Sequence, residues 1–214
     1  MTDEDVVAEA TALVAVDPDG ARELLEGLFA RPEPPTPEIA WECAQIRREL
    51  DTDDHEVIAW YEAALGSGDP TIVARAHARV GYLHSWQGSP DGIPHLRIAM
   101  ASGIDDEPTE SALYLAYLVD DDDEAEHLFR LALDNADRIH RAEAALGLAT
   151  LFVERDPDAA AAFARCCYSW GKQEDRVAAM EVLRALGHDE PELGAPAVLP
   201  PSSTPATGWR RDAT

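Results

Sequence analysis

The feature of this sequence that most restricts its fold is a helical segment that recurs five times. The copies start at residues 20, 57, 92, 125 and 159, so that successive copies lie 37, 35, 33 and 34 residues apart. A recurrence of this length is typical of proteins that stack one small supersecondary unit on the next. A chain of 214 residues can hold a short array of such units.

Within each copy, small and large residues follow one another at positions i, i+4, i+7 and i+8. The first position holds Gly20, Val57, Gly92, Ala125 and Ala159, and the second holds Leu24, Tyr61, Leu96, Phe129 and Phe163. The third holds Gly27, Ala64, Ala99, Ala132 and Cys166, and the fourth holds Leu28, Leu65, Met100, Leu133 and Cys167. This spacing lies on one face of an amphipathic helix. We expect the small residues to admit a neighbouring helix and the large ones to fill the space between helices.

Each copy follows another segment with helical periodicity, so the repeated unit is predicted to be a pair of helices. The first helices of the pairs are expected at about residues 3–16, 37–50, 71–86, 109–119 and 138–154. A capping residue comes before a proline of the first turn at three places: Asp17-Pro18, Ser89-Pro90 and Asp156-Pro157. Gly68, Gly103 and Gly171 are expected near helix ends, where a left-handed residue is wanted.

No alternation of the β type persists over a useful length. The predicted fold class is therefore all-α, an α-solenoid of about five antiparallel helix pairs plus a C-terminal capping helix at about residues 174–187. The helical repeat domain is expected to span residues 1–188. Residues 189–214 are rich in Pro, Ser and Thr and are predicted to be disordered. They end in a Trp209-Arg210-Arg211 cluster, which could be a docking motif, could fold back onto the acidic chain, or could be unused.

The charge of the chain narrows the choice of partner. The net charge is −25 at pH 7, and Lys172 is the only lysine. Such a surface repels nucleic-acid backbones and anionic membranes, so neither is expected as a partner. A neutral or basic protein or peptide is expected, although the charge could serve only for solubility. The acidic N-terminus and the absence of an apolar run of ~20 residues predict a cytoplasmic protein.

The columns of the repeat resemble the tetratricopeptide family, whose period is about 34 residues. Ala125, Phe129 and Ala132 match the small, aromatic and alanine positions of that family's second helix. Its large-then-small pair in the first helix is matched by Val80-Gly81, Leu115-Ala116 and Leu146-Gly147. The segment at 59–69 also resembles the related Sel-one-like repeats. The resemblance covers roughly residues 3–187 and implies a superhelix of helical hairpins.

The resemblance also implies a function, which is to hold another protein in a concave groove lined by first helices. Proteins of this kind are seldom enzymes, so a non-catalytic adaptor or scaffold is expected. Family positions place these residues in the partner-binding groove: Trp41, Arg48, Arg75, Tyr82, Trp86, Tyr117 and Arg141, with Gln45, Ser85, Glu110 and Leu148 beside them. The aromatic residues could instead pack between helices. A small-ligand-binding domain, an unrecognised enzyme and a self-associating module remain alternatives.

Acidic and histidine side chains are the remaining candidates for sites of chemistry. The acidic runs at 51–56 and 119–127 contain no glycine for a cation loop and are expected to cap the helices that follow them. His77 and His84 share a helix face, but a zinc site would need a further ligand, so ordinary histidines are favoured. No nucleophile, phosphate-loop or dinucleotide motif occurs. We therefore expect no catalytic residue, no metal and no cofactor.

The adjacent cysteines Cys166 and Cys167 occupy packing columns of the repeat. They have no C-x-x-C partner, and the third cysteine, Cys43, is distant in sequence. We expect them to be buried, reduced and unreactive.

Overall fold

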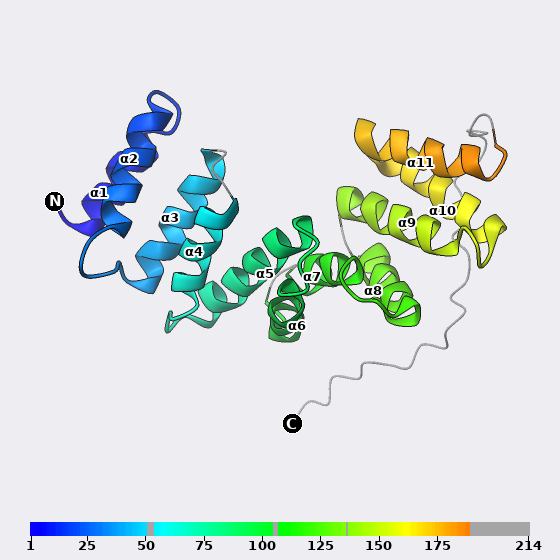
Figure 1. The fold of residues 1–214 in the computed structure, drawn as a ribbon, viewed down its shortest axis with the longest axis horizontal. Coiled ribbons are helices and arrows are strands. Elements are labelled where there is room, and N and C mark those ends of the chain that lie inside the picture. Colours follow the sequence, from blue (N-terminus) through cyan, green and yellow to red (C-terminus); the bar gives the residue numbers. More distant parts are fainter. Residues whose placement is uncertain (51–53, 105–106, 136, 189–214) are drawn as a thin grey trace. The chain divides into compact units, whose positions relative to one another are not determined.

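The computed structural model describes residues 1–50, 54–104, 107–135 and 137–188, and these form eleven α-helices and no strand (Figure 1). The helices are α1 Asp3–Leu13, α2 Pro18–Phe29, α3 Pro37–Glu49, α4 Asp54–Ala64, α5 Pro70–Trp86, α6 Gly92–Ser102, α7 Glu107–Ala116, α8 Asp122–Asn135, α9 Arg138–Phe152, α10 Pro157–Trp170 and α11 Gln173–Ala185. The all-α prediction and the extra helix after the fifth pair are confirmed. The predicted tail at 189–214 lies outside the described residues.

The chain divides into two compact units, Met1–Leu118 and Val119–Thr214. In the first unit, α1 packs on α2, α3 on α4 and α5 on α6, and the first helices also contact one another in the order α1, α3, α5, α7. In the second unit, α9 packs on α8, α10 and α11. The predicted fourth pair, α7 and α8, falls on the boundary between the units.

The Asp-Pro-Asp segments begin helices as predicted. Asp17 Oδ1 accepts a hydrogen bond of 3.0 Å from Gly20 N, and Asp156 Oδ1 accepts one of 3.0 Å from Ala159 N. Each satisfies a backbone donor of the first turn, which has no partner within the helix. A capping side chain followed by proline also begins α3 and α5, at Thr36 and Asp69.

Three predictions about helix ends are wrong. Ser89-Pro90 does not begin a helix, because these residues form a turn in which Gly92 N donates to Ser89 O, and α6 starts only at Gly92. Gly103 has the expected left-handed backbone with φ of 65°, but Gly68 does not have a positive φ, and Gly171 is extended with φ of −72° and ψ of 165°. A Cβ atom at Gly171 would lie 2.5 Å from Asp175 Cβ, so that glycine serves a close approach instead.

In the last four copies, the second and third columns of the repeat lie in the core, while Leu65 and Met100 of the fourth column and Ala159 of the first are only partly buried. The large residues Tyr61, Leu96, Phe129 and Phe163 are buried, and so are Ala64, Ala99, Ala132 and Cys166. These side chains lie where the sequence pattern placed them, facing neighbouring helices.

The first copy has a different register. Gly27 is exposed, and α2 buries Ala21, Leu25 and Leu28 instead. The equivalent residues of α10 are Ala160, Ala164 and Cys167, and they are also buried. α10 packs against both α9 and α11, so it buries both stripes, whereas α2 packs mainly on α1 and reaches α3 and α4 through Glu26 and Phe29.

Candidate functional site

The predicted groove residues of the third and fourth pairs lie on one surface of the first unit. Four residues of α5 follow one another at helical spacing along one face: Arg75, Arg79, Tyr82 and Trp86. The neighbouring α7 contributes Glu110 and Tyr114, and Tyr117 follows its last residue. We call these seven residues the α5–α7 surface.

Ring and charge contacts join the two helices of this surface. The ring centroids of Tyr82 and Tyr114 are 4.6 Å apart in an edge-on arrangement, and those of Tyr82 and Trp86 are 6.0 Å apart. Arg79 NH1 lies 3.8 Å from Glu110 Oε2, with both side chains about a quarter exposed. Edge-to-face aromatic pairs are worth about 0.5–1.5 kcal/mol beyond their burial. These contacts therefore hold Tyr82 in place between α5 and α7.

Two of the rings on this surface are largely open to solvent. Trp86 is 72% exposed and Tyr117 is 51% exposed. They are among the most exposed large hydrophobic side chains of the described residues. A large ring left in water forgoes the stabilisation of about 1.5–3 kcal/mol that burial of such a side chain gives. The packing interpretation of the aromatic residues therefore fits Tyr82 and does not fit Trp86.

The second pair presents its predicted residues on α3. The Trp41 ring is partly buried, 5.5 Å from that of Tyr61, and Gln45 Nε2 donates to Tyr61 Oη at 3.2 Å. Burial raises the pKa of Tyr61, while the positive charges of Arg48 and Arg79 oppose part of that rise. The two arginines come from α3 and α5, so charges on both helices act on this hydroxyl.

The fifth pair provides its predicted residues in the second unit. Arg141, on α9, is exposed, and its NH2 group donates to the backbone oxygen of Asp134 at 3.3 Å. Leu148, which was expected to be exposed in the groove, is instead completely buried. The expectation was wrong because α9 packs against α8, α10 and α11, which leaves less of its surface open than the family pattern implies.

Two members of the α5–α7 surface were not predicted, Arg79 and Tyr114. A signal for both was present in the sequence. Arg79 comes four residues after Arg75, and Tyr114 comes four residues after Glu110. Each therefore lies on the same helix face as a residue that was predicted to line the groove.

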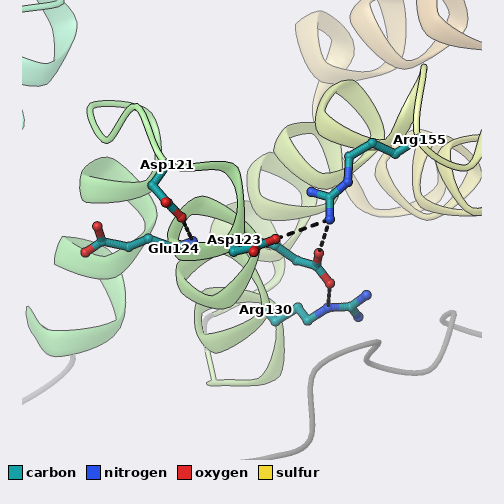
Figure 2. Close-up of polar contacts among 6 residues, drawn as sticks. Asp121, Asp123, Glu124, Arg130 and Arg155 are labelled. Carbon is teal, nitrogen blue, oxygen red and sulfur yellow. Dashed lines mark hydrogen bonds and ion pairs between the residues drawn. The ribbon is translucent and has the colours of Figure 1, made fainter.

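The acidic run before α8 caps that helix, as predicted. Asp121 Oδ1 accepts a 2.8 Å hydrogen bond from Glu124 N (Figure 2).

One member of the acidic run, Glu126, has a different role. Glu126 is 2% exposed, its Oε1 lies 2.9 Å from Arg130 Nε, and its Oε2 lies 3.5 Å from Arg155 NH2. The run at 51–56 lies outside the described side chains.

The arginines around Glu126 also contact aromatic rings. The Arg130 guanidinium carbon lies 5.4 Å from the ring centroid of Phe163, and that of Arg155 lies 5.2 Å from that of Phe152. A buried carboxylate is tolerated only with charged hydrogen-bond partners. This cluster therefore has a structural role within the second unit.

The cysteines are buried, as predicted. Cys43, Cys166 and Cys167 are thiols and not halves of a disulfide, and burial raises the pKa of Cys43 and Cys167 to about 12 and that of Cys166 to about 11. Only the thiolate is a nucleophile, and a raised pKa leaves very little thiolate at neutral pH. Burial therefore makes these thiols unreactive.

We expect the three thiols of the folded protein to react with a disulfide reagent only as fast as the chain unfolds. The measurement is the release of thionitrobenzoate from the reagent, in buffer and in urea. The rate in urea should match that of a free thiol. Rapid release from the folded protein would contradict the assignment of these cysteines to the core.

No protein-family model, curated protein or solved structure matches this chain. Among the described helices, none has the length and apolar character needed to cross a membrane.

Proposed function

We propose that this chain is a non-catalytic helical-repeat adaptor that holds a partner protein on the α5–α7 surface. The observation that carries the proposal is the exposure of Trp86 and Tyr117, at 72% and 51%, on the same surface as Arg75 and Arg79. Trp, Tyr and Arg are the residue types that contribute most to the energy of protein interfaces.

The packing of the first helices supports the architecture that goes with this function, a solenoid similar to that of tetratricopeptide repeats. In the first unit, α1, α3, α5 and α7 contact one another in succession, and in the second unit α9 contacts α11. A stack of first helices creates one extended surface. Trp41 and Arg48 on α3 would extend the binding surface beyond α5, and Arg141 would serve the second unit in the same way.

The partner segment is proposed to be neutral or basic overall. The net charge of −25 attracts basic chains and repels acidic ones at long range. At short range, the guanidinium of Arg75 could donate hydrogen bonds to a backbone carbonyl or a carboxylate of the segment. The rings of Trp86 and Tyr117 would cover its apolar side chains.

The test is to identify a partner by affinity capture from the native host with mass spectrometry, and then to measure its affinity for variants of this chain. Replacing Trp86 and Tyr117 together by alanine should weaken binding by about thirtyfold or more, as expected for two interface residues of this kind. Both rings are largely exposed, so the variant should keep its fold. Adding Tyr82→Ala should weaken binding further.

A matched control is Ile98→Ala on α6, an apolar side chain of similar exposure, 48%, that is not part of the α5–α7 surface. Its affinity for the partner should equal that of the original chain. Unchanged affinity in the Trp86→Ala, Tyr117→Ala variant, with an unchanged circular dichroism spectrum, would show that the partner binds elsewhere.

A further inference from the structure

Three of the seven histidines lie together on the α5–α6 hairpin of the first unit. His77 and His84 are on α5, and His95 is on α6. The Nδ1 atoms of His77 and His95 are 3.1 Å apart, and the ring centroids of His84 and His95 are 6.4 Å apart. The tertiary structure therefore brings Nδ1 of His95 on α6 next to His77 on α5, and the sequence did not predict this contact.

The two rings are held by helices that approach each other closely. A Cβ atom on Gly81 would lie 2.5 Å from Leu96 Cγ, and one on Gly92 would lie 2.9 Å from Gly81 O. Leu96, next to His95, is completely buried. Because α5 and α6 are in backbone contact here, the positions of His77 and His95 are set by the core and not by a loop.

A separation of 3.1 Å suits a metal chelate as well as a hydrogen bond. Two nitrogen ligands at ~2.0–2.1 Å from a tetrahedral Zn²⁺ ion lie about 3.3 Å apart. To bind one ion through both Nδ1 atoms, the two nitrogens would move apart only slightly, and each ring would turn so that its lone pair points at the ion instead of at the other nitrogen. In the absence of an ion, the same two atoms can share one proton in an N–H···N hydrogen bond.

The surroundings are also suited to a cation. Glu62 brings a negative charge near His95, and Nδ1 of His84 is shielded from solvent without a hydrogen-bond partner among the described residues. Within the same part of the chain, no group of three or more His, Cys, Asp or Glu side chains is arranged to hold a metal. The site therefore offers two protein nitrogens, fewer than the three or four ligands of a catalytic or structural zinc site, and water would fill the other coordination positions.

We propose that His77 and His95 form a two-nitrogen site for Zn²⁺ on the α5–α6 hairpin. Imidazole selects ions of this class over Mg²⁺ and Ca²⁺, which prefer oxygen ligands. The many carboxylates of the chain attract cations of every kind, so selectivity against Mg²⁺ is the property that distinguishes this site from general charge attraction.

The experiment is a calorimetric titration of the full chain with Zn²⁺ in a large excess of Mg²⁺. One saturable site is expected. Each of His77→Asn and His95→Asn should reduce its affinity by at least about tenfold, since each removes a ligand. The matched control is His127→Asn on α8, whose side chain is exposed, and its affinity for Zn²⁺ should be unchanged.

A second measurement uses no variant at the site. In NMR spectra of the original chain, Zn²⁺ should shift the ring carbon-bound proton signals of His77 and His95 and leave that of His127 in place. Zn²⁺ should also raise the thermal unfolding midpoint, because it binds the folded form. The proposal would be overturned by equal shifts at His127, by no shift at His77 and His95, or by full affinity in either site variant.

Discussion

Replacing Arg130 by methionine should lower the free energy of unfolding by about 3–5 kcal/mol, because it removes an arginine that pairs with a buried carboxylate. Glu126 is 2% exposed, and Arg130 Nε lies 2.9 Å from its Oε1. The second arginine, Arg155, lies farther away at 3.5 Å and is 38% exposed. Water screens that contact, so Arg155 compensates only in part. The measurement is urea denaturation followed by circular dichroism.

The double variant Glu126→Met, Arg130→Met separates loss of the ion pair from loss of packing. It removes both charges and keeps apolar side chains beside Phe152 and Phe163, so its stability should return to within about 1 kcal/mol of the original, or exceed it. A matched control is Arg155→Met, for which the loss should be about 1 kcal/mol or less. A double variant as unstable as Arg130→Met alone would show that the charges are not what makes this cluster sensitive.

The second large effect is expected at Gly147, where α9 passes closest to α8. A Cβ atom there would lie 2.3 Å from Phe129 Cε1 and 2.4 Å from Phe129 Cζ. Phe129 is 4% exposed, so its ring has little free space into which to move. Gly147→Ala should therefore destabilise the protein by about 2 kcal/mol, because the strain of overpacking exceeds the gain in helix propensity of ~1 kcal/mol.

The same substitution at Gly27 is the matched control. Gly27 lies within α2, and a Cβ atom there would meet nothing within 4 Å. Gly27→Ala should stabilise the protein by about 0.5–1 kcal/mol, since alanine has the higher helix propensity. Phe129→Leu should recover part of the loss in Gly147→Ala, because it removes the two ring atoms that clash. Equal effects of alanine at 147 and 27 would contradict the close approach of α8 and α9.

The helices could be predicted from the sequence because their signals are local. Capping residues such as Asp17 and Asp156 act on backbone groups three residues away, and the spacing of Leu96 and Ala99 follows from the helix period alone. Ser89-Pro90 shows the limit of such signals. It has the composition of a helix start, but the chain forms a turn there and begins the helix at Gly92.

The candidate surface was predicted in outline from the family resemblance and was refined by contacts between helices. Tyr82, Trp86 and Tyr117 were named from the sequence. The pairing of Tyr82 with Tyr114 and of Arg79 with Glu110 depends on how α7 packs on α5, which no local pattern encodes. Leu148 was misplaced for the same reason, since its burial follows from the neighbours of α9.

By itself, the sequence determined that the chain is all-α, where most of its helices begin, and which large and small residues of the second and third columns are buried in α4, α6, α8 and α10. These properties follow from backbone hydrogen bonding and from the helix period, which act over a few residues. Only the tertiary structure decided the register of α2, the burial of Glu126 between two arginines and the pairing of His77 with His95. Each of these depends on how segments that are distant in the sequence pack together, which no local pattern sets.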